Sequence, residues 1–293
     1  MKRMFGSITR LSRLAIAAGS LALLVGAVAP ASAEGEGPKP ERQDWTFWGP
    51  FGYYDKAQLQ RGFKVYREVC SNCHSLKLLA FRNLSDPGGP EFSEAQVKAL
   101  AAEYKVMGEP DDKGDVNLRP GRPADYFPLV FPNDKAAAAA NGGGIPPDMS
   151  LLAKARGVKA GFPGFVFDIV RQYQEGGPDY IHALIAEGYL ADETKDKPPE
   201  GVKIPEGKHY NKFFPGNVIS MTKPLVDKQV EYTDGTPMTV DQYTRDVSSF
   251  LMWAAEPHLA ERKEMGFKVI LFLIVMSGLL YFTKKKVWAA EAH

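Results

Sequence analysis

The feature that most constrains this chain is the sequence Cys70-Ser-Asn-Cys73-His74, which contains its only two cysteines. Two thiols placed on one helical turn can each add to a vinyl group along the same edge of a porphyrin. A histidine directly after the second thiol then lies beneath the iron as its proximal ligand. The motif therefore predicts one covalently attached haem c, held by Cys70 and Cys73, with His74 on the iron.

Two other uses of a C-x-x-C pair fit the sequence less well. A structural zinc site would need two more Cys or His ligands nearby, and the remaining histidines stand singly along the chain: His182, His209, His258 and His293. A thioredoxin-type redox pair would need a surrounding βαβ pattern, which the sequence does not show. A redox dithiol or a chance match is the alternative to haem attachment.

Both ends of the chain carry apolar segments. Residues 1–33 combine a basic start, an apolar run and the small residues Ala31-Ser32-Ala33, which is typical of a cleaved signal peptide. An uncleaved N-terminal anchor is the alternative. Residues 265–283 are apolar except for Lys268 and would span about 28 Å as a helix, one hydrocarbon core. A buried core helix is the alternative there.

The distribution of charged residues predicts how the chain is oriented in the membrane. Three lysines, 284–286, follow the C-terminal apolar segment, and such an excess of positive charge favours the cytoplasmic side. We therefore expect an exported domain at 34–264, an anchor at 265–283 and a short cytoplasmic tail at 284–293. Residues 34–267 hold 28 basic and 34 acidic residues, a net charge of −6. Such a domain would attract a basic soluble partner and repel nucleic acid, unless the charge only aids solubility.

Periodicity and capping signals predict helices between long loops. The first should run from about Lys56 to the haem motif, with Asp55 as its N-cap, and a second should follow Ser93. Further helices are expected at 149–156, 165–173, 180–188 and 240–253. Residues 108–123, rich in Gly, Pro and Asp, are expected to be largely loop, and 230–238 a small hairpin around Asp234-Gly235.

The ligand on the other side of the iron decides what a haem does. A second protein ligand suits electron transfer, whereas an open position suits catalysis or gas binding. Met221 is the first candidate because it lies in an extended, proline-containing loop at 214–224. The alternatives are other methionines and three histidines, which are His182, His209 and His258.

Four segments in this order resemble the cytochrome c1 family, the c-type haem subunits of the cytochrome bc1 complex. They are the haem segment 61–74, Ala-Asp-Tyr-Phe-Pro at 124–128, Ala-Asn-Gly-Gly-Gly-Ile-Pro-Pro-Asp at 140–148, and Ser-Phe-Leu-Met-Trp-Ala-Ala-Glu-Pro at 249–257. The resemblance runs from about Trp45 to the C-terminal anchor. It implies a mainly α c-type cytochrome domain with long loop insertions and one C-terminal transmembrane helix.

The resemblance also implies roles for particular residues. Met221 matches the family's distal ligand, and Arg156 matches an arginine that pairs with a haem propionate. Tyr180 matches a tyrosine near the propionates. The backbone carbonyl of Pro146 or Pro147 would orient His74. Unlike some bacterial relatives, this chain has no cysteines for an extra disulfide, so packing alone would have to hold the Met221 loop.

The function implied is one-electron transfer without bond-making in a substrate. The chain would accept an electron from a Rieske iron-sulfur protein, beside cytochrome b, and pass it to a soluble or membrane-tethered c-type cytochrome. Its expected place is the inner membrane of a bacterium, with the haem domain in the periplasm, in contact with the lipid bilayer and not with nucleic acid. A free-standing membrane-anchored electron shuttle and a c-haem enzyme with an open iron are the alternatives.

Overall fold

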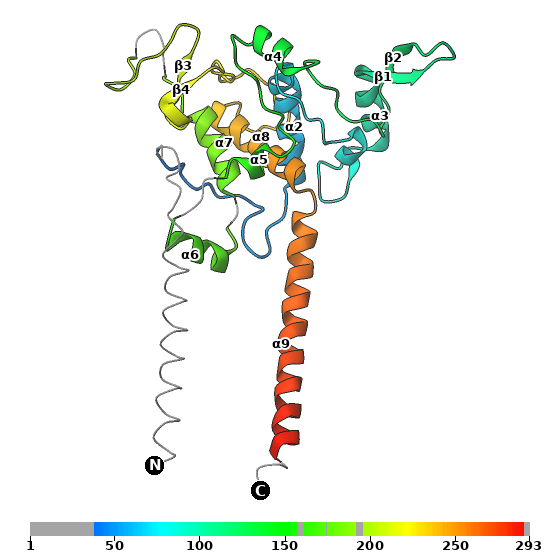
Figure 1. Ribbon diagram of the computed structural model, residues 1–293, viewed down its shortest axis with the longest axis vertical. Helices are drawn as coiled ribbons and strands as arrows, with labels where there is room; N and C mark the ends of the chain where they lie inside the picture. Colours follow the sequence, from blue (N-terminus) through cyan, green and yellow to red (C-terminus); the bar gives the residue numbers. More distant parts are fainter. Residues whose placement is uncertain (1–37, 158–160, 174, 192–195, 290–293) are drawn as a thin grey trace, which may run out of the picture. The chain divides into compact units, whose positions relative to one another are not determined.

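The computed structural model describes residues 38–157, 161–173, 175–191 and 196–289. The predicted signal peptide and the last residues of the predicted tail, 290–293, lie outside that part of the chain. Within it, helices dominate and two small antiparallel sheets occur (Figure 1). The predicted fold class is confirmed: the chain is mainly helical and ends in one long apolar helix.

The elements are, in chain order, α2 (Lys56–Glu68), the 3₁₀ turns η1 (Cys70–Asn72) and η2 (Phe81–Ser85), α3 (Glu94–Glu103), β1 (Lys105–Pro110), β2 (Val116–Pro120), α4 (Asp134–Ala140), α5 (Leu152–Ala155), α6 (Gly164–Arg171), α7 (Gly176–Ala186), β3 (His209–Tyr210), η3 (Pro215–Asn217), β4 (Val218–Ile219), α8 (Val240–Ala255) and α9 (Leu259–Ala289).

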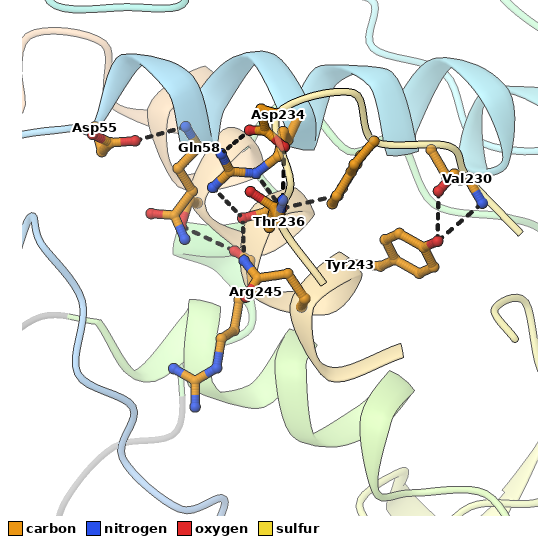
Figure 2. Close-up of polar contacts among 12 residues, drawn as sticks. Asp55, Gln58, Val230, Asp234, Thr236, Tyr243 and Arg245 are labelled. Carbon is orange, nitrogen blue, oxygen red and sulfur yellow. Dashed lines mark hydrogen bonds and ion pairs between the residues drawn. The ribbon is translucent and has the colours of Figure 1, made fainter. Parts of the chain in front are cut away.

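Helix α2 begins where the sequence predicts it. Asp55 Oδ1 accepts a hydrogen bond of 2.7 Å from the backbone N–H of Gln58, as Figure 2 shows. This cap satisfies one of the amides that the first turn leaves without a helical partner. The helix buries the predicted face, which includes Leu59, Phe63 and Tyr66. It ends two residues before Cys70, so the packing of α2 determines where the haem motif lies.

Helix α8 is the main support of α2, and the two lie side by side (Figure 1). They approach most closely at Gly62, where an added Cβ would lie 2.0 Å from the backbone oxygen of Asp246. Glycine therefore sets the distance between the helices. The core around this contact is aromatic, and its largest fully buried side chains include Phe47, Phe81, Tyr243, Phe250 and Trp253.

A buried carboxylate joins the same two helices. Asp246 on α8 is fully buried and accepts hydrogen bonds from Arg61 Nε of α2, Tyr232 Oη and Gln242 Nε2, each at 2.9 Å. Removing one member of such a buried ion pair costs about 3–5 kcal/mol, because the other charge loses its partner. The network therefore specifies how α2 sits on α8.

Helices α5 and α7 both pack against α8 and against each other. At their contact, an added Cβ on Gly177 would lie 1.6 Å from the backbone oxygen of Ala153. A side chain there would separate the two helices. Helix α5 is much shorter than the predicted 149–156, whereas α7 and α8 begin and end within a few residues of the predicted ranges, except that α7 starts four residues earlier.

Two expectations about strands need correction. Half of the segment 108–123, predicted to be largely loop, lies in strands, because β1 and β2 pair in antiparallel fashion, with Lys105 opposite Pro120. The segment 230–238 turns as expected, and Thr236 N donates to Asp234 Oδ1 at 3.1 Å (Figure 2), but it forms no strands. Its flank bonds to α8 instead, since Val230 exchanges hydrogen bonds with the Tyr243 hydroxyl.

Helix α9 contains the predicted anchor. It is long and apolar enough to cross a membrane, and its apolar side chains between 269 and 282 are exposed. Nothing in the described part of the chain packs over this stretch. A soluble core helix would be buried, so the alternative of a buried helix at 265–283 is not supported.

Candidate haem site

The C-x-x-C-H motif continues directly from the end of α2. After Val69 the chain tightens into the 3₁₀ turn η1, and the amides of Cys73 and His74 both donate to the carbonyl of Cys70, at 3.1 and 2.9 Å. This turn brings both thiols and the imidazole to one end of the helix. Cys70 and Cys73 are half-buried, and His74 is 9% exposed.

The imidazole of His74 has a fixed orientation. Its Nδ1 lies 2.8 Å from the backbone oxygen of Pro147, which requires that Nδ1 carries the proton and donates it. The Tyr66 hydroxyl donates to the His74 carbonyl at 3.1 Å. Burial lowers the pKa of His74, although the Pro147 carbonyl and Asp148 act in the opposite direction. The ring is thus held neutral, with Nε2 as the nitrogen available to a metal.

Pro147 is held in place by its neighbours. Asp148 accepts hydrogen bonds of 3.0 Å from the backbone amides of Lys77 and Ser150, one to each carboxylate oxygen. Met149 N also donates to Ser75 O at 2.8 Å. These bonds join residues 147–150 to the segment just after the motif. The carbonyl that contacts His74 is that of Pro147, so the geometry distinguishes it from Pro146.

The two thiols do not have the character of a reactive redox pair. Burial, and to a lesser extent the neighbouring Cys73, raises the pKa of Cys70 to about 12. Redox-active thiols have lowered pKa values and are partly exposed to attack. In the described part of the chain, no group of three or more His, Cys, Asp or Glu side chains is placed to hold a metal ion. The dithiol and zinc alternatives therefore have no structural support.

Met221 lies in a loop, as its sequence context predicts. It follows β4, is half-buried, and its carbonyl accepts a hydrogen bond of 3.0 Å from the Tyr189 hydroxyl. Lys208 Nζ donates both to Ser220 Oγ at 2.8 Å and to Gly142 O at 3.1 Å. One lysine thus links the loop before Met221 to the glycine-rich segment that leads to Pro147.

This link is reinforced by close packing at Gly144. A Cβ added there would lie 2.7 Å from the Ser220 Cβ, so the two loops touch. The short pairing of β3 with β4, His209 opposite Ile219, holds the Met221 loop from the other side. Hydrogen bonds and packing therefore secure this loop in a chain whose only cysteines belong to the haem motif.

Arg156 and Tyr180 form a separate pair. Arg156 caps the C-terminus of α5 and is exposed, and Tyr180 lies half-buried on α7. Burial raises the pKa of Tyr180, and the charge of Arg156 acts in the opposite direction. The contact of α5 with α7 at Gly177 brings together the two helices that carry these residues.

The alternative histidine ligands have other partners. His182 is buried on α7, and its Nε2 lies 2.9 Å from Asp241 Oδ1. His258 is exposed, and its Nδ1 lies 2.9 Å from Glu261 Oε2. His209 lies in β3. None of these contacts involves a residue of the haem motif.

Comparison with known proteins gives the family. The profile of the cytochrome C1 family matches residues 45–291. The chain belongs to this family. It is 48% identical over 273 residues to a cytochrome c1 of Blastochloris viridis, covering 92% of this chain and 94% of the relative. With a cytochrome c1 of Rhodospirillum rubrum it shares 45% identity over 296 residues, covering 98% and 100%.

A further relative is longer. The cytochrome b/c1 of Bradyrhizobium diazoefficiens is 56% identical over 278 residues, which are 95% of this chain and only 39% of that protein. The chain therefore spans about two fifths of this relative, and nearly the whole length of the other two.

Cytochrome c1 membership implies a haem c cofactor, and the residues present fit one. The donor set consists of two thiols on one turn and a neutral imidazole whose Nδ1 is hydrogen-bonded to the Pro147 carbonyl, which leaves Nε2 for the iron. Two apolar side chains beside Pro147 in the sequence, Ile145 and Leu151, are more than half exposed at 54% and 51%. A flat apolar group would shield such side chains from water.

Sequence reasoning missed two contributors to this site. Lys208 belongs to no recognisable motif. It contributes because its side chain bonds both the loop of Ser220 and the glycine-rich segment at Gly142. Asp148 follows the proline pair, and an Asx-type pattern of Asp followed by Ser two residues on could have indicated its capping bond to Ser150.

Proposed function

We propose that this chain is the haem c electron-transfer subunit of a cytochrome bc1 complex. One haem c would be attached through thioethers to Cys70 and Cys73, with His74 and Met221 as axial ligands. The observation that carries the proposal is the bond from His74 Nδ1 to the Pro147 carbonyl, made within a C-x-x-C-H turn of a cytochrome c1 family member. When bound, the haem supplies a one-electron couple.

The residues around His74 prepare it as a ligand. The Pro147 carbonyl fixes the tautomer and the plane of the ring, and it increases the electron density on Nε2. Because hydrogen bonds of Asp148 and Ser75 hold the segment around Pro147, the carbonyl that orients the ring is itself fixed in place. The imidazole therefore changes little in position between oxidation states, which favours fast outer-sphere transfer.

Met221 would be the second protein ligand of the iron. A thioether ligand favours the reduced iron and raises the reduction potential. The links through Lys208 and Gly144 tie the loop before Met221 to the segment before Pro147, so the two axial ligands would be positioned by one connected structure. Arg156, with Tyr180 beside it, would pair with a propionate, for which a guanidinium fork is well suited.

The partners follow from the family and from the charge. The electron donor would be a Rieske iron-sulfur protein, held in the complex with cytochrome b, and the acceptor a soluble or membrane-tethered c-type cytochrome. The net charge of −6 between 34 and 267 would attract a basic acceptor. Residues 1–33 would direct export, and Lys284, Lys285 and Lys286 would keep the tail in the cytoplasm of a bacterium, with the haem domain in the periplasm.

The test is to follow electrons through the assembled complex. The tagged chain is purified from membranes, quinol is added, and reduction of the c-type haem and of an added c-type cytochrome is recorded by stopped flow. Met221→Leu should lower the potential and strongly slow reduction of the c-type haem, and with it reduction of the added cytochrome. Met107→Leu, on an exposed side chain of β1, should leave both rates unchanged.

Two results would contradict the proposal. Undisturbed transfer in Met221→Leu would remove Met221 from the ligand set. A tagged chain that purifies from gently solubilised membranes without any b-type cytochrome would favour the free-standing shuttle instead.

A further inference from the structure

Helix α6 exposes an unusual amount of apolar surface. Five of its eight residues have large apolar side chains that are 42–78% exposed, and Phe162, just before it, is 84% exposed. The five are Phe165, Val166, Phe167, Ile169 and Val170. A helix that is apolar nearly all round is normally buried in protein or in lipid, because water disfavours such a surface.

The polar side of α6 is turned towards the domain. Asp168 is only 17% exposed and accepts two hydrogen bonds from Arg42 Nη2, at 2.7 and 2.9 Å. The same guanidinium lies over the ring of Tyr173, 4.3 Å from its centroid. Tyr173 in turn donates to Asp179 of α7 at 2.5 Å. These contacts tie down the polar side of α6, and they leave Val166, Phe167 and Val170 exposed at 42%, 57% and 78%.

The start of the membrane helix lies across a cavity from α6. This cavity of about 1210 Å³ is lined by Phe162, Phe165 and Ile169 around α6, and by Gly266, Phe267 and Ile270 of α9. Ile270 lies two residues beyond Lys268, inside the apolar stretch of α9. Helix α6 is therefore level with the point at which α9 enters the hydrocarbon.

Two exposed aromatic side chains contact residues that line this cavity. Phe51 is 74% exposed and contacts Phe267 with ring centroids 5.7 Å apart. Trp48, 43% exposed, lies against Tyr173, with 6.4 Å between ring centroids. Exposed aromatic residues at the entry of a spanning helix are typical of the membrane interface.

The charge of the cavity is opposite to that of the domain. Its lining includes five basic side chains against two acidic ones, whereas residues 34–267 carry a net charge of −6. Arg42 is paired with Asp168, and Glu256 pairs with both Lys154 and Arg262, so a basic excess remains after these ion pairs are counted. The basic residues are Lys39, Arg42, Lys154, Arg262 and Lys263, and the acidic ones are Asp168 and Asp179. A phospholipid would fit both kinds of lining residue, because its phosphate can pair with the basic side chains and its acyl chains can pack against the phenylalanines.

We propose that α6 is an interfacial helix that lies in the leaflet on the haem-domain side of the membrane, and that its cavity with α9 holds an anionic phospholipid. The domain then has a second membrane contact besides the span of α9. This limits tilting of the haem domain about the single transmembrane helix. The inference requires that α9 crosses a membrane, and it does not depend on the axial ligands or the electron partners.

The first test measures where α6 lies. Once both native cysteines are bound to haem, Val170→Cys supplies the only free thiol for a nitroxide spin label. Met107→Cys, exposed to a similar degree on β1, is the matched control. The full-length holoprotein is placed in nanodiscs of phosphatidylcholine and phosphatidylglycerol. At position 170, collision with oxygen should exceed that with an aqueous nickel chelate severalfold, and at 107 the order should be reversed.

Two outcomes would overturn the interfacial placement. A label at 170 as accessible to the nickel chelate as the label at 107 would place α6 in water. A label shielded from both reagents would show that a protein, such as a second copy of the chain, covers the helix instead. An unchanged haem spectrum in both variants confirms that the domain is folded.

The second test measures the lipid itself. Phosphatidylglycerol retained by the detergent-purified holoprotein is counted by native mass spectrometry in Lys39→Glu and in Lys113→Glu, which lies outside the cavity. Lys39→Glu should reduce the retained lipid at least twofold, and Lys113→Glu should not. Equal retention in the two variants would overturn the lipid assignment.

Discussion

Replacing Gly62 by alanine tests how the haem motif is supported. The new Cβ would lie 2.0 Å from the carbonyl oxygen of Asp246 and 2.7 Å from the Cβ of Phe250, whereas real Cβ contacts essentially never fall below 3.0 Å. Helix α2 would have to move about 1 Å from α8, because the first obstacle is backbone and not a flexible side chain. The change therefore acts on the element that carries Cys70.

Two free-energy effects compete in this variant. Alanine is favoured over glycine inside a helix by about 1 kcal/mol. Overpacking of a core costs about 1–3 kcal/mol and more where the backbone has to shift. Because the clash at Gly62 involves backbone at 2.0 Å, overpacking should prevail, and we expect Gly62→Ala to lower the free energy of unfolding by about 2 kcal/mol.

The assay is urea unfolding of the holoprotein in detergent, followed by far-ultraviolet circular dichroism. Gly266→Ala is the control, since that glycine is also helical and has no atom within 4 Å of an added Cβ. The control meets no obstacle and should raise the free energy of unfolding by up to about 1 kcal/mol, the ordinary preference of a helix for alanine. If Gly62→Ala is as stable as the control, the two helices are not in contact at this position and the reasoning fails.

Three further predictions concern single side chains. Asp246→Ala should lower the free energy of unfolding, measured by urea titration, by about 3 kcal/mol. This is the lower end of the cost of a broken buried ion pair, because Arg61 keeps its second partner, Asp234. Burial lowers the pKa of His182 in the folded protein, although Asp241 acts in the opposite direction. As pH falls below about 6.5, His182 therefore takes up a proton in the unfolded chain before it does so in the folded protein. The free energy of unfolding should therefore decline between about pH 7 and pH 5, and it should decline less in His182→Leu. Urea unfolding at both pH values measures this, and an equal decline in the two proteins would show that His182 is not the cause. Asp148→Ala removes two backbone hydrogen bonds, which should cost about 1–2 kcal/mol of stability. It should also raise the reduction potential, because a loosened Pro147 carbonyl gives less electron density to the His74 ring; an unchanged potential would contradict this support.

Local signals in the sequence were enough to place most helices. Asp55 and Ser93 cap α2 and α3 as predicted, and Ser93 with Gln96 forms a capping box. These signals work because a cap involves residues three apart, whose geometry the sequence fixes directly. The same holds for the C-x-x-C-H turn, which is closed by bonds between neighbouring residues.

Contacts between distant residues explain what the sequence did not reveal. The turn at 234–235 has the residues of a hairpin, but its flank finds hydrogen bonds on α8, and so no strands form. Strands β1 and β2 were missed because their glycine and prolines argue against strands, while pairing at the rim of the fold tolerates them. The choice between Pro146 and Pro147 depended on which carbonyl meets an imidazole 73 residues away in sequence.

The haem site likewise combines residues that local sequence signals reveal with residues that only distant contacts bring together. Motif spacing placed Cys70, Cys73 and His74 together, because all three lie within one turn. Nothing local indicates that Lys208 connects the loop of Met221 to the segment before Pro147. Such a contact arises only when α7, α8 and the sheet of β3 and β4 are packed in three dimensions.

A redox titration of the purified holoprotein, combined with its visible spectrum under carbon monoxide, tests the central claim most directly. The account predicts a high potential and a reduced spectrum that carbon monoxide does not change, because His74 and Met221 close both axial positions. A low potential with ready binding of carbon monoxide would contradict it, since the iron would then be open and the chain suited to catalysis or gas binding instead of electron transfer.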